Sequence, residues 1–177
     1  MARRILNGVV NVESLCTELA RLLLQRGWML ATAESCTGGL IAATCTDLSG
    51  SSRWFDRGFV TYSNAAKAEM LGVDPLLIDT VGAVSEPVAR AMAEGAVRPA
   101  PRHHASSAPT HVSLAVTGVA GPTGGTPEKP VGMVWFAWHV AGQTSTEVRL
   151  FDGNRAAVRE QTTTHALAHL VELLQQA

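Results

Sequence analysis

The feature that most constrains the fold of this chain is an apolar stretch that leads into a helix through a polar, glycine-containing turn. Residues 28–33 have the character of a short strand, Glu34-Ser-Cys-Thr-Gly-Gly39 forms the turn, and helical character begins at Leu40. A strand joined to a helix in this way predicts a sheet covered by helices. The free amides at the start of such a helix point into the crevice at the strand's end. The turn brings Ser35 and Cys36 there, although Ser, Thr and Gly also occur in such turns for capping and geometry alone.

In the remainder of the chain, segments of strand character again alternate with segments of helical character. The pair Ala141-Gly142 joins two strands as a hairpin, which makes the sheet mixed. We therefore predict a single domain over residues 1–177, folded as a three-layer α/β/α sandwich with a mixed, largely parallel sheet and a flexible loop at about 98–110. Helices are expected at 12–26, 40–47, 65–71, 86–97 and 156–174, and further strands at 58–63, 111–117, 131–139 and 144–151.

Composition narrows the classes of function. The 177 residues carry a net charge of −1, so nothing favours a nucleic-acid partner, and no apolar run resembles a signal peptide or a membrane span. Three cysteines without a C-x-x-C pair argue against a disulfide framework or a zinc ribbon. The adjacent pair His103-His104 has no acidic cluster beside it, so we expect no metal and no cofactor. A cytoplasmic location is the simplest expectation.

A second polar strand end carries a lysine. The strand predicted at 58–63 ends in Tyr62-Ser63-Asn64, and Asn64 as N-cap places Lys67 in the first turn of the next helix. The positive end of the helix dipole disfavours a cation there, which shifts a lysine toward the neutral amine that can act as a base. A lysine on a solvated helix face has no such role, so this residue type alone leaves both interpretations open.

A third candidate segment is the glycine-rich loop 118–125, which follows a predicted strand. Its amides can approach an anion closely, but it matches neither the P-loop nor a dinucleotide fingerprint, and it can also be read as a plain surface loop. Arg155 begins the last helix, again the unfavourable end for a cation unless an anion lies nearby.

Together these motifs resemble the CinA C-terminal domain family, whose members include bacterial nicotinamide-mononucleotide deamidases. The resemblance covers the chain from about Val12 to the last helix. The motifs that carry it are Ala33-Glu-Ser-Cys-Thr-Gly-Gly39, Gly50-Ser-Ser52, Gly58-Phe-Val-Thr-Tyr-Ser-Asn64 with Lys67, Gly82-Ala-Val-Ser-Glu-Pro87, and Thr117-Gly-Val-Ala-Gly-Pro-Thr-Gly-Gly125 followed by Lys129-Pro-Val-Gly132.

The resemblance implies an activity and two catalytic residues. The activity is hydrolysis of the carboxamide of nicotinamide mononucleotide to nicotinate mononucleotide and ammonia, a step of pyridine nucleotide salvage. The implied mechanism is that of a metal-free Ser/Lys amidohydrolase, with Ser35 as nucleophile and Lys67 as base. The chemistry of the residues leaves the thiol of Cys36 open as the nucleophile, and the hydroxyls of Ser51 and Ser52 as a third possibility.

Roles in substrate binding are assigned to the other polar and glycine residues. The partner expected is a small-molecule nucleotide, bound by a homo-oligomer without nucleic acid or membrane. The amides near Thr37, Gly38 and Gly39 are expected to stabilise an oxyanion, Ser52 to line the substrate, Tyr62 to pack on the pyridinium, and Gly121, Gly124, Gly125 and Arg155 to bind the 5′-phosphate.

Two other classes of function remain open from the sequence. One is a different enzyme of nucleotide metabolism with another amide or phosphate substrate in the same pocket. The other is a non-enzymatic nucleotide-binding or competence- and DNA-repair-associated module. An ammonia assay with pyridine nucleotides separates the first from the proposed activity, and salt-dependent DNA binding without amidase activity identifies the second.

Overall fold

Five strands form one sheet in the order β2-β1-β3-β4-β5. In the computed structural model, which describes residues 11–98 and 110–177, β1 (Met29–Glu34) lies between β2 (Phe55–Val60) and β3 (Thr110–Gly118) and is parallel to both. β4 (Met133–Val140) is antiparallel to β3 and to β5 (Gln143–Leu150). The sheet is therefore mixed, with β1, β2, β3 and β5 running in one direction, as the sequence predicts.

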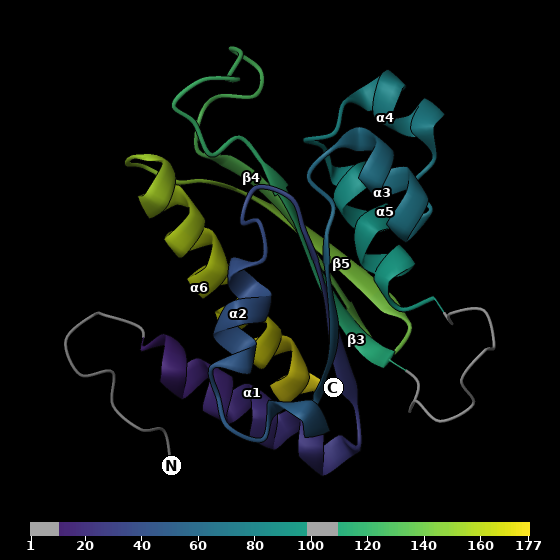
Figure 1. Ribbon diagram of the computed structural model, residues 1–177, viewed down its shortest axis with the longest axis vertical. Coiled ribbons are helices and arrows are strands. Elements are labelled where there is room, and N and C mark those ends of the chain that lie inside the picture. Colours follow the sequence, from purple (N-terminus) through teal and green to yellow (C-terminus); the bar gives the residue numbers. More distant parts are fainter. Residues whose placement is uncertain (1–10, 99–109) are drawn as a thin grey trace.

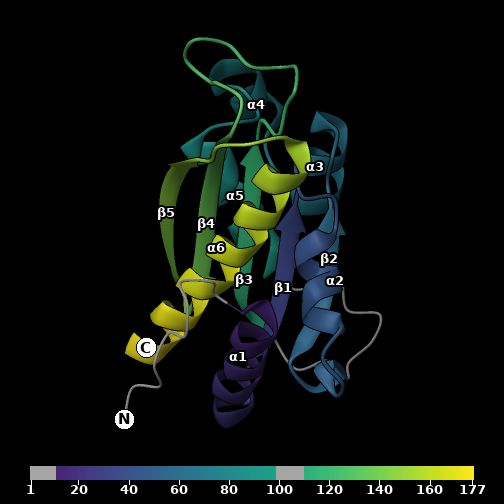
Figure 2. The ribbon, with the colours of Figure 1, turned by 90° about the vertical axis from the view of Figure 1, so that its left-hand side faces the viewer.

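Helices cover both faces of this sheet, which confirms the three-layer α/β fold (Figure 1). One face carries α1 (Val12–Arg26), α2 (Leu40–Thr46) and α6 (Arg155–Gln176), seen in front of the sheet in Figure 2. The other face carries α3 (Asn64–Leu71), α4 (Pro75–Val81) and α5 (Glu86–Ala96). A short 3-10 helix, η1 (Ser51–Arg53), precedes β2.

Strand alternation divides the core into two. Val112, Leu114 and Val116 of β3 point into the core under α1, α2 and α6, whereas Ala115 points into the core under α3, α4 and α5. Small side chains on the second face allow close packing. At Gly95 of α5 an added Cβ would lie 2.1 Å from the carbonyl oxygen of Leu71, so α3 and α5 are in direct backbone contact there.

Three local predictions need correction. β2 is placed at 55–60 rather than 58–63, because residues 61–63 leave the sheet and lead into α3. Ser63 rather than Asn64 caps α3, since its Oγ accepts from the amide of Ala66, and Lys67 is therefore the fourth helical residue. No helix was expected between residues 71 and 86, but α4 begins there at Pro75 and is capped by Asp74.

Two further expectations concern the predicted loop at about 98–110 and the absence of a membrane-spanning segment. Residues 99–109 of the predicted flexible loop, with the pair His103-His104, lie outside the described residues. None of the helices within the described ranges has the length and apolarity needed to cross a bilayer.

Candidate active site

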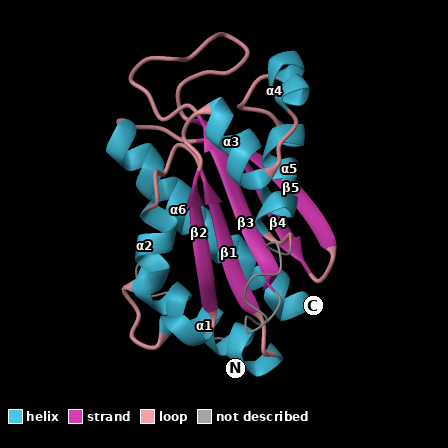
Figure 3. Ribbon diagram, turned by 45° about the vertical axis from the view of Figure 1, so that its right-hand side comes forward, coloured by secondary structure: helices cyan, strands magenta, loops and turns pink. Residues whose placement is uncertain are grey.

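The ends of three parallel strands form the candidate site. Glu34, the last residue of β1, is paired with Val60 of β2 and with Val116 of β3. The segments that follow these strands therefore leave the sheet side by side, in the place where ligands bind in open α/β sheets. Figure 2 shows the arrowhead of β1 at the end that carries the long loop between β3 and β4. In Figure 3 the pink loops gather at this same end.

Ser35 and Lys67 meet at this edge, as the sequence predicts. Nζ of Lys67 lies 3.1 Å from Oγ of Ser35 and donates to the carbonyl oxygen of Thr61 at 2.8 Å. The lysine is 1% exposed, and this burial lowers its pKa below the ordinary value for lysine. A buried amine pushed toward its neutral form, within hydrogen-bond distance of a hydroxyl, is the arrangement needed to activate that hydroxyl.

Cys36 has the opposite environment. Its side chain is 5% exposed and belongs to the core beneath α1, α2 and α6. Burial raises the pKa of its thiol to about 11, so the thiolate form needed for nucleophilic attack is disfavoured. The geometry therefore favours Ser35 as the nucleophile.

We expect Cys36→Ser to keep kcat within about fivefold of the wild type, because a protonated, buried thiol contributes packing rather than reactivity. Iodoacetamide should inhibit the wild-type enzyme poorly for the same reason. Steady-state ammonia release measures both effects. An inactive Cys36→Ser protein alongside an active Ser35→Ala protein would transfer the nucleophilic role to the thiol.

Glu34 holds the turn that carries Ser35. Its side chain is fully buried, and its carboxylate accepts five hydrogen bonds, four from groups around the start of α2 and one from Thr32 of β1. Oε2 accepts from Thr37 Oγ1 at 2.7 Å and from the amides of Gly39 and Ile41 at 3.0 Å each. Oε1 accepts from the amide of Ala42 at 2.8 Å and from Thr32 Oγ1 at 3.2 Å. The amides at the start of α2 are thus satisfied by the protein's own carboxylate.

This arrangement changes the expected set of oxyanion donors. The amide of Gly39 donates to Glu34, and that of Gly38 donates to the carbonyl oxygen of Ser35 at 3.1 Å. Neither N–H is free to bind a developing negative charge, so the predicted oxyanion role of these two amides is not supported. Thr37 is fully buried, so its amide is not placed to meet a substrate either. In the turn, this leaves the amide of Cys36, which directly follows Ser35.

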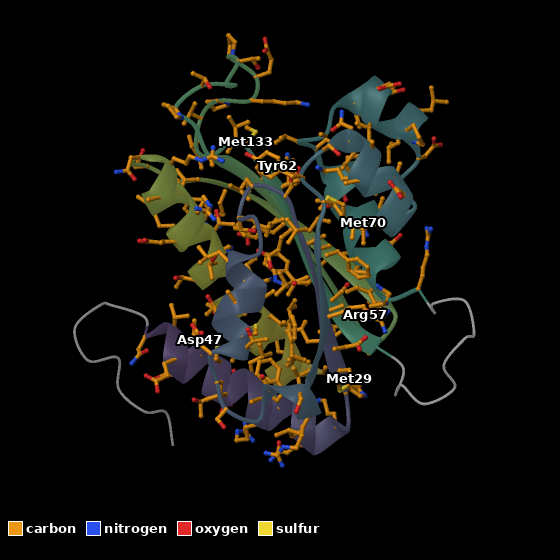
Figure 4. All side chains as sticks on the ribbon, in the orientation of Figure 1. Met29, Asp47, Arg57, Tyr62, Met70 and Met133 are labelled. Carbon is orange, nitrogen blue, oxygen red and sulfur yellow. The ribbon has the colours of Figure 1, made fainter. Side chains whose placement is uncertain are left out.

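A cavity of about 280 Å³ opens beside Ser35 and Lys67. Among the residues predicted to bind substrate, it contains Tyr62, Gly121, Gly124 and Arg155. Thr37, Gly38, Gly39 and Gly125 do not line this cavity, and Ser52 belongs to η1 before the start of β2, at the opposite end of the sheet. Figure 4 shows the two ends of the sheet: Tyr62 and Met133 are labelled toward the top, and Met29, the first residue of β1, toward the bottom. The remaining lining residues are Cys36, Asn64, Ala83, Val84, Thr117, Gly118, Val119, Ala120 and Thr123.

Arg155, at the start of α6, connects two segments that line the cavity, the loop at Gly121 and the segment at Tyr62. Nη1 donates to the carbonyl oxygen of Gly121 and Nη2 to Oη of Tyr62, both at 2.8 Å. The guanidinium is exposed, so it can exchange either partner for a ligand's anionic group. Arg155 and the glycine loop therefore lie together, as predicted.

Sequence reasoning missed three polar residues of this region. Asn64 was read only as a cap, yet it lines the cavity as the first residue of α3. Thr117 lines the cavity and donates its hydroxyl to the carbonyl oxygen of Ala83 at 2.8 Å. Arg159 donates from Nη2 to the carbonyl oxygen of Thr37 at 2.7 Å. Its position one turn after Arg155 was the available signal, because residues four apart share a helix face.

A model of the CinA C-terminal domain matches residues 12–174. This chain belongs to the CinA C-terminal domain family. Its similarity to nicotinamide-nucleotide amidohydrolase PncC of Escherichia coli is 49% identity over 161 residues, which cover 90% of this chain and 93% of that protein. A CinA-like protein of Syntrophobacter fumaroxidans is 45% identical over 164 residues, but here the match spans 93% of this chain and 37% of the relative.

Solved structures of the family share the fold. A CinA superfamily protein from Klebsiella pneumoniae superposes with a TM-score of 0.85 at 38% sequence identity, covering 95% of this chain and all of that one. The CinA family thus includes both proteins of this length and longer ones in which the domain is about a third of the polypeptide.

Proposed function

We propose that this chain hydrolyses the carboxamide of nicotinamide mononucleotide to nicotinate mononucleotide and ammonia, as an enzyme of pyridine nucleotide salvage. The observation that carries the proposal is the buried Lys67 amine 3.1 Å from Oγ of Ser35, at the wall of a cavity. It is supported by the similarity to nicotinamide-nucleotide amidohydrolases over about nine-tenths of both chains.

Acylation begins when neutral Lys67 takes the proton of Ser35 Oγ. The oxygen attacks the carboxamide carbon, and the carbonyl oxygen becomes an oxyanion that the amide of Cys36 stabilises. The protonated Lys67 then gives its proton to the amide nitrogen as the C–N bond breaks. Ammonia leaves, and the nicotinate group remains as an ester on Ser35.

Deacylation uses the same groups in reverse. Lys67 takes a proton from a water molecule, whose oxygen attacks the ester, and returns the proton to Ser35 Oγ as the C–O bond breaks. The donation from Lys67 to the carbonyl oxygen of Thr61 holds Nζ in place through both halves of the cycle. The chain needs no metal for these steps.

The lining of the cavity suits a mononucleotide. Its volume of about 280 Å³ is just below the usual range for small-molecule sites, about 300–1,000 Å³. Arg155 and the loop around Gly121 offer a guanidinium fork and main-chain groups to the 5′-phosphate. The ring of Tyr62 is positioned at the rim, where a cationic pyridinium can lie against its face.

We expect Arg155→Ala to raise KM about thirtyfold while kcat changes little. A phosphate clamp acts on the ground state and the transition state alike, and a charge-assisted contact contributes about 2 kcal/mol. Initial rates over a range of nicotinamide mononucleotide concentrations give both constants. An unchanged KM with a collapsed kcat would instead place Arg155 at the reacting carbon.

The rate should also depend on pH through Lys67. Only the neutral amine accepts a proton, so kcat/KM should rise with pH. Because burial lowers the pKa of Lys67, the rise should have its midpoint below about 10.4, the ordinary value. A pH profile in buffers of constant ionic strength measures it. A midpoint near 6.5 would indicate a histidine base and contradict the role of Lys67.

The direct test of the proposed activity compares three substrates with the purified chain: nicotinamide mononucleotide, nicotinamide riboside and nicotinamide. We expect ammonia and nicotinate mononucleotide in equal amounts from the first, and rates lower by at least about tenfold from the two compounds that lack the phosphate. No ammonia from the mononucleotide, or equal rates with all three, would reject the proposed substrate.

The setting of the reaction follows from the same features. All three cysteines are free and buried, which suits the reducing cytoplasm that we propose as the location. A homo-oligomer, with no nucleic-acid or membrane partner, remains a prediction, for which gel filtration and a DNA-binding assay are the tests.

A further inference from the structure

Arg159 lies on α6 one helical turn after Arg155 and faces the turn that carries Ser35. Its Nη2 donates to the carbonyl oxygen of Thr37 at 2.7 Å, across 122 residues of sequence. The same nitrogen would lie 3.7 Å from a Cβ placed on Gly38. Arg159 does not line the cavity, so it is not placed to contact the substrate there.

The Ser35–Gly39 turn depends on contacts of this kind for its shape. Gly38 and Gly39 have φ angles of 60° and 95°. Glycine adopts positive φ about as readily as negative φ, so the backbone of these two residues contributes little rigidity of its own. Glu34 fixes the turn from within by accepting from the Thr37 hydroxyl and the Gly39 amide. Arg159 fixes it from outside at the Thr37 carbonyl. Thr37 is thus bound by a buried carboxylate on one side and a guanidinium on the other.

Two successive residues of the turn have different tasks. The Cys36 amide is assigned to the oxyanion, and the Thr37 carbonyl is the group that Arg159 binds. Fixing the carbonyl restrains ψ of Thr37 and the path of the backbone back to Ser35. The positive charge of Arg159 also acts at this turn: burial raises the pKa of Cys36, and Arg159 is one of the charges that oppose the rise.

We propose that Arg159 is a positioning residue that holds the nucleophile turn and the oxyanion-binding amide of Cys36 in the reactive geometry. The role rests on the proposed amidase function. Two arginines of one helix face then have different roles: Arg155 binds the substrate, and Arg159 holds the Ser35–Gly39 turn in place.

The test compares Arg159→Gln and Arg159→Lys with the wild type in steady-state assays on nicotinamide mononucleotide. We expect Arg159→Gln to lower kcat about 100-fold, the effect of a misplaced reacting group, with KM unchanged within about threefold. Arg159→Lys keeps the charge without the planar fork and should recover part of the loss. The matched control is Arg149→Gln on β5, which removes an exposed arginine paired with Glu147 and should leave both constants unchanged.

A second measurement does not depend on activity. A loosened turn exposes the Cys36 thiol, so its alkylation by iodoacetamide, followed on the peptide by mass spectrometry, should be at least about tenfold faster in Arg159→Gln than in the wild type or Arg149→Gln. A merely stabilising residue would lower Tm without changing kcat, KM or this alkylation rate well below Tm.

The outcomes separate the two proposals. A wild-type chain that releases no ammonia rejects the proposed function, while the alkylation rate still decides whether Arg159 orders the turn. An active wild type with Arg159→Gln equally active, or with unchanged Cys36 alkylation, rejects the positioning role alone. A raised KM at unchanged kcat also overturns it, because Arg159 would then bind substrate as Arg155 does.

Discussion

Ser35→Ala and Lys67→Met should each lower kcat for nicotinamide mononucleotide by about 10³-fold or more. Without the hydroxyl there is no covalent route, and without the amine the hydroxyl is not activated. The two atoms are 3.1 Å apart and act as one unit, so the double variant should be little slower than either single one. Single-turnover and steady-state ammonia release, corrected for the folded fraction, measure the three rates.

Controls for this series are available in the same chain. Ser51→Ala and Ser52→Ala remove hydroxyls from the distant η1 and should leave kcat unchanged. Additive losses in the double variant, or a Ser35→Ala protein with wild-type kcat, would show that Ser35 and Lys67 do not form a catalytic pair. Loss of activity in Ser52→Ala would bring η1 back as part of the site.

The second large effect is expected at Glu34. In Glu34→Gln an NH₂ group replaces one of the two accepting oxygens. This NH₂ group is a donor and cannot accept the hydrogen bonds that the surrounding N–H and O–H groups gave to the carboxylate oxygen. Breaking a buried, fully used carboxylate network leaves several donors unsatisfied, so the free energy of unfolding should fall by about 3 kcal/mol. Urea unfolding followed by circular dichroism measures the change.

Activity should fall together with this stability. The residual folded Glu34→Gln protein should show a reduced kcat, because the turn that positions Ser35 loses its internal anchor. The matched control is Glu160→Gln on the exposed face of α6, which should change the free energy of unfolding by less than about 0.5 kcal/mol. An equally small change in Glu34→Gln would mean that the carboxylate does not hold the turn.

Local sequence patterns predicted the sandwich, and the resemblance to the CinA C-terminal domain family supplied Ser35 and Lys67 as the proposed catalytic pair. The apolar strand before Glu34 and the helix after Gly39 are both determined by nearby residues, and so is the position of Lys67 within one turn of the helix start. Proximity of Ser35 and Lys67 needed one further condition, that β1 and β2 be parallel neighbours, which the structure meets.

Contacts between distant segments escaped prediction. Glu34 is adjacent to Ser35 in sequence, but its role depends on the side chain turning back under α2, which no local pattern indicates. The amides of Gly38 and Gly39 were assigned to an oxyanion for the same reason, since their partners, the carbonyl oxygen of Ser35 and the carboxylate of Glu34, appear only in the folded turn. Arg159 reaches Thr37 across 122 residues, so only the folded chain brings the two together.

The covalent intermediate on Ser35 is the central claim, and hydroxylamine tests it most directly. Hydroxylamine added to the reaction with nicotinamide mononucleotide should intercept the ester and release the hydroxamate in place of nicotinate mononucleotide, so that ammonia exceeds nicotinate mononucleotide by the amount of hydroxamate formed. Ammonia and nicotinate mononucleotide that stay equal at every hydroxylamine concentration, with no hydroxamate, would mean that water attacks the carboxamide directly and that Ser35 forms no ester.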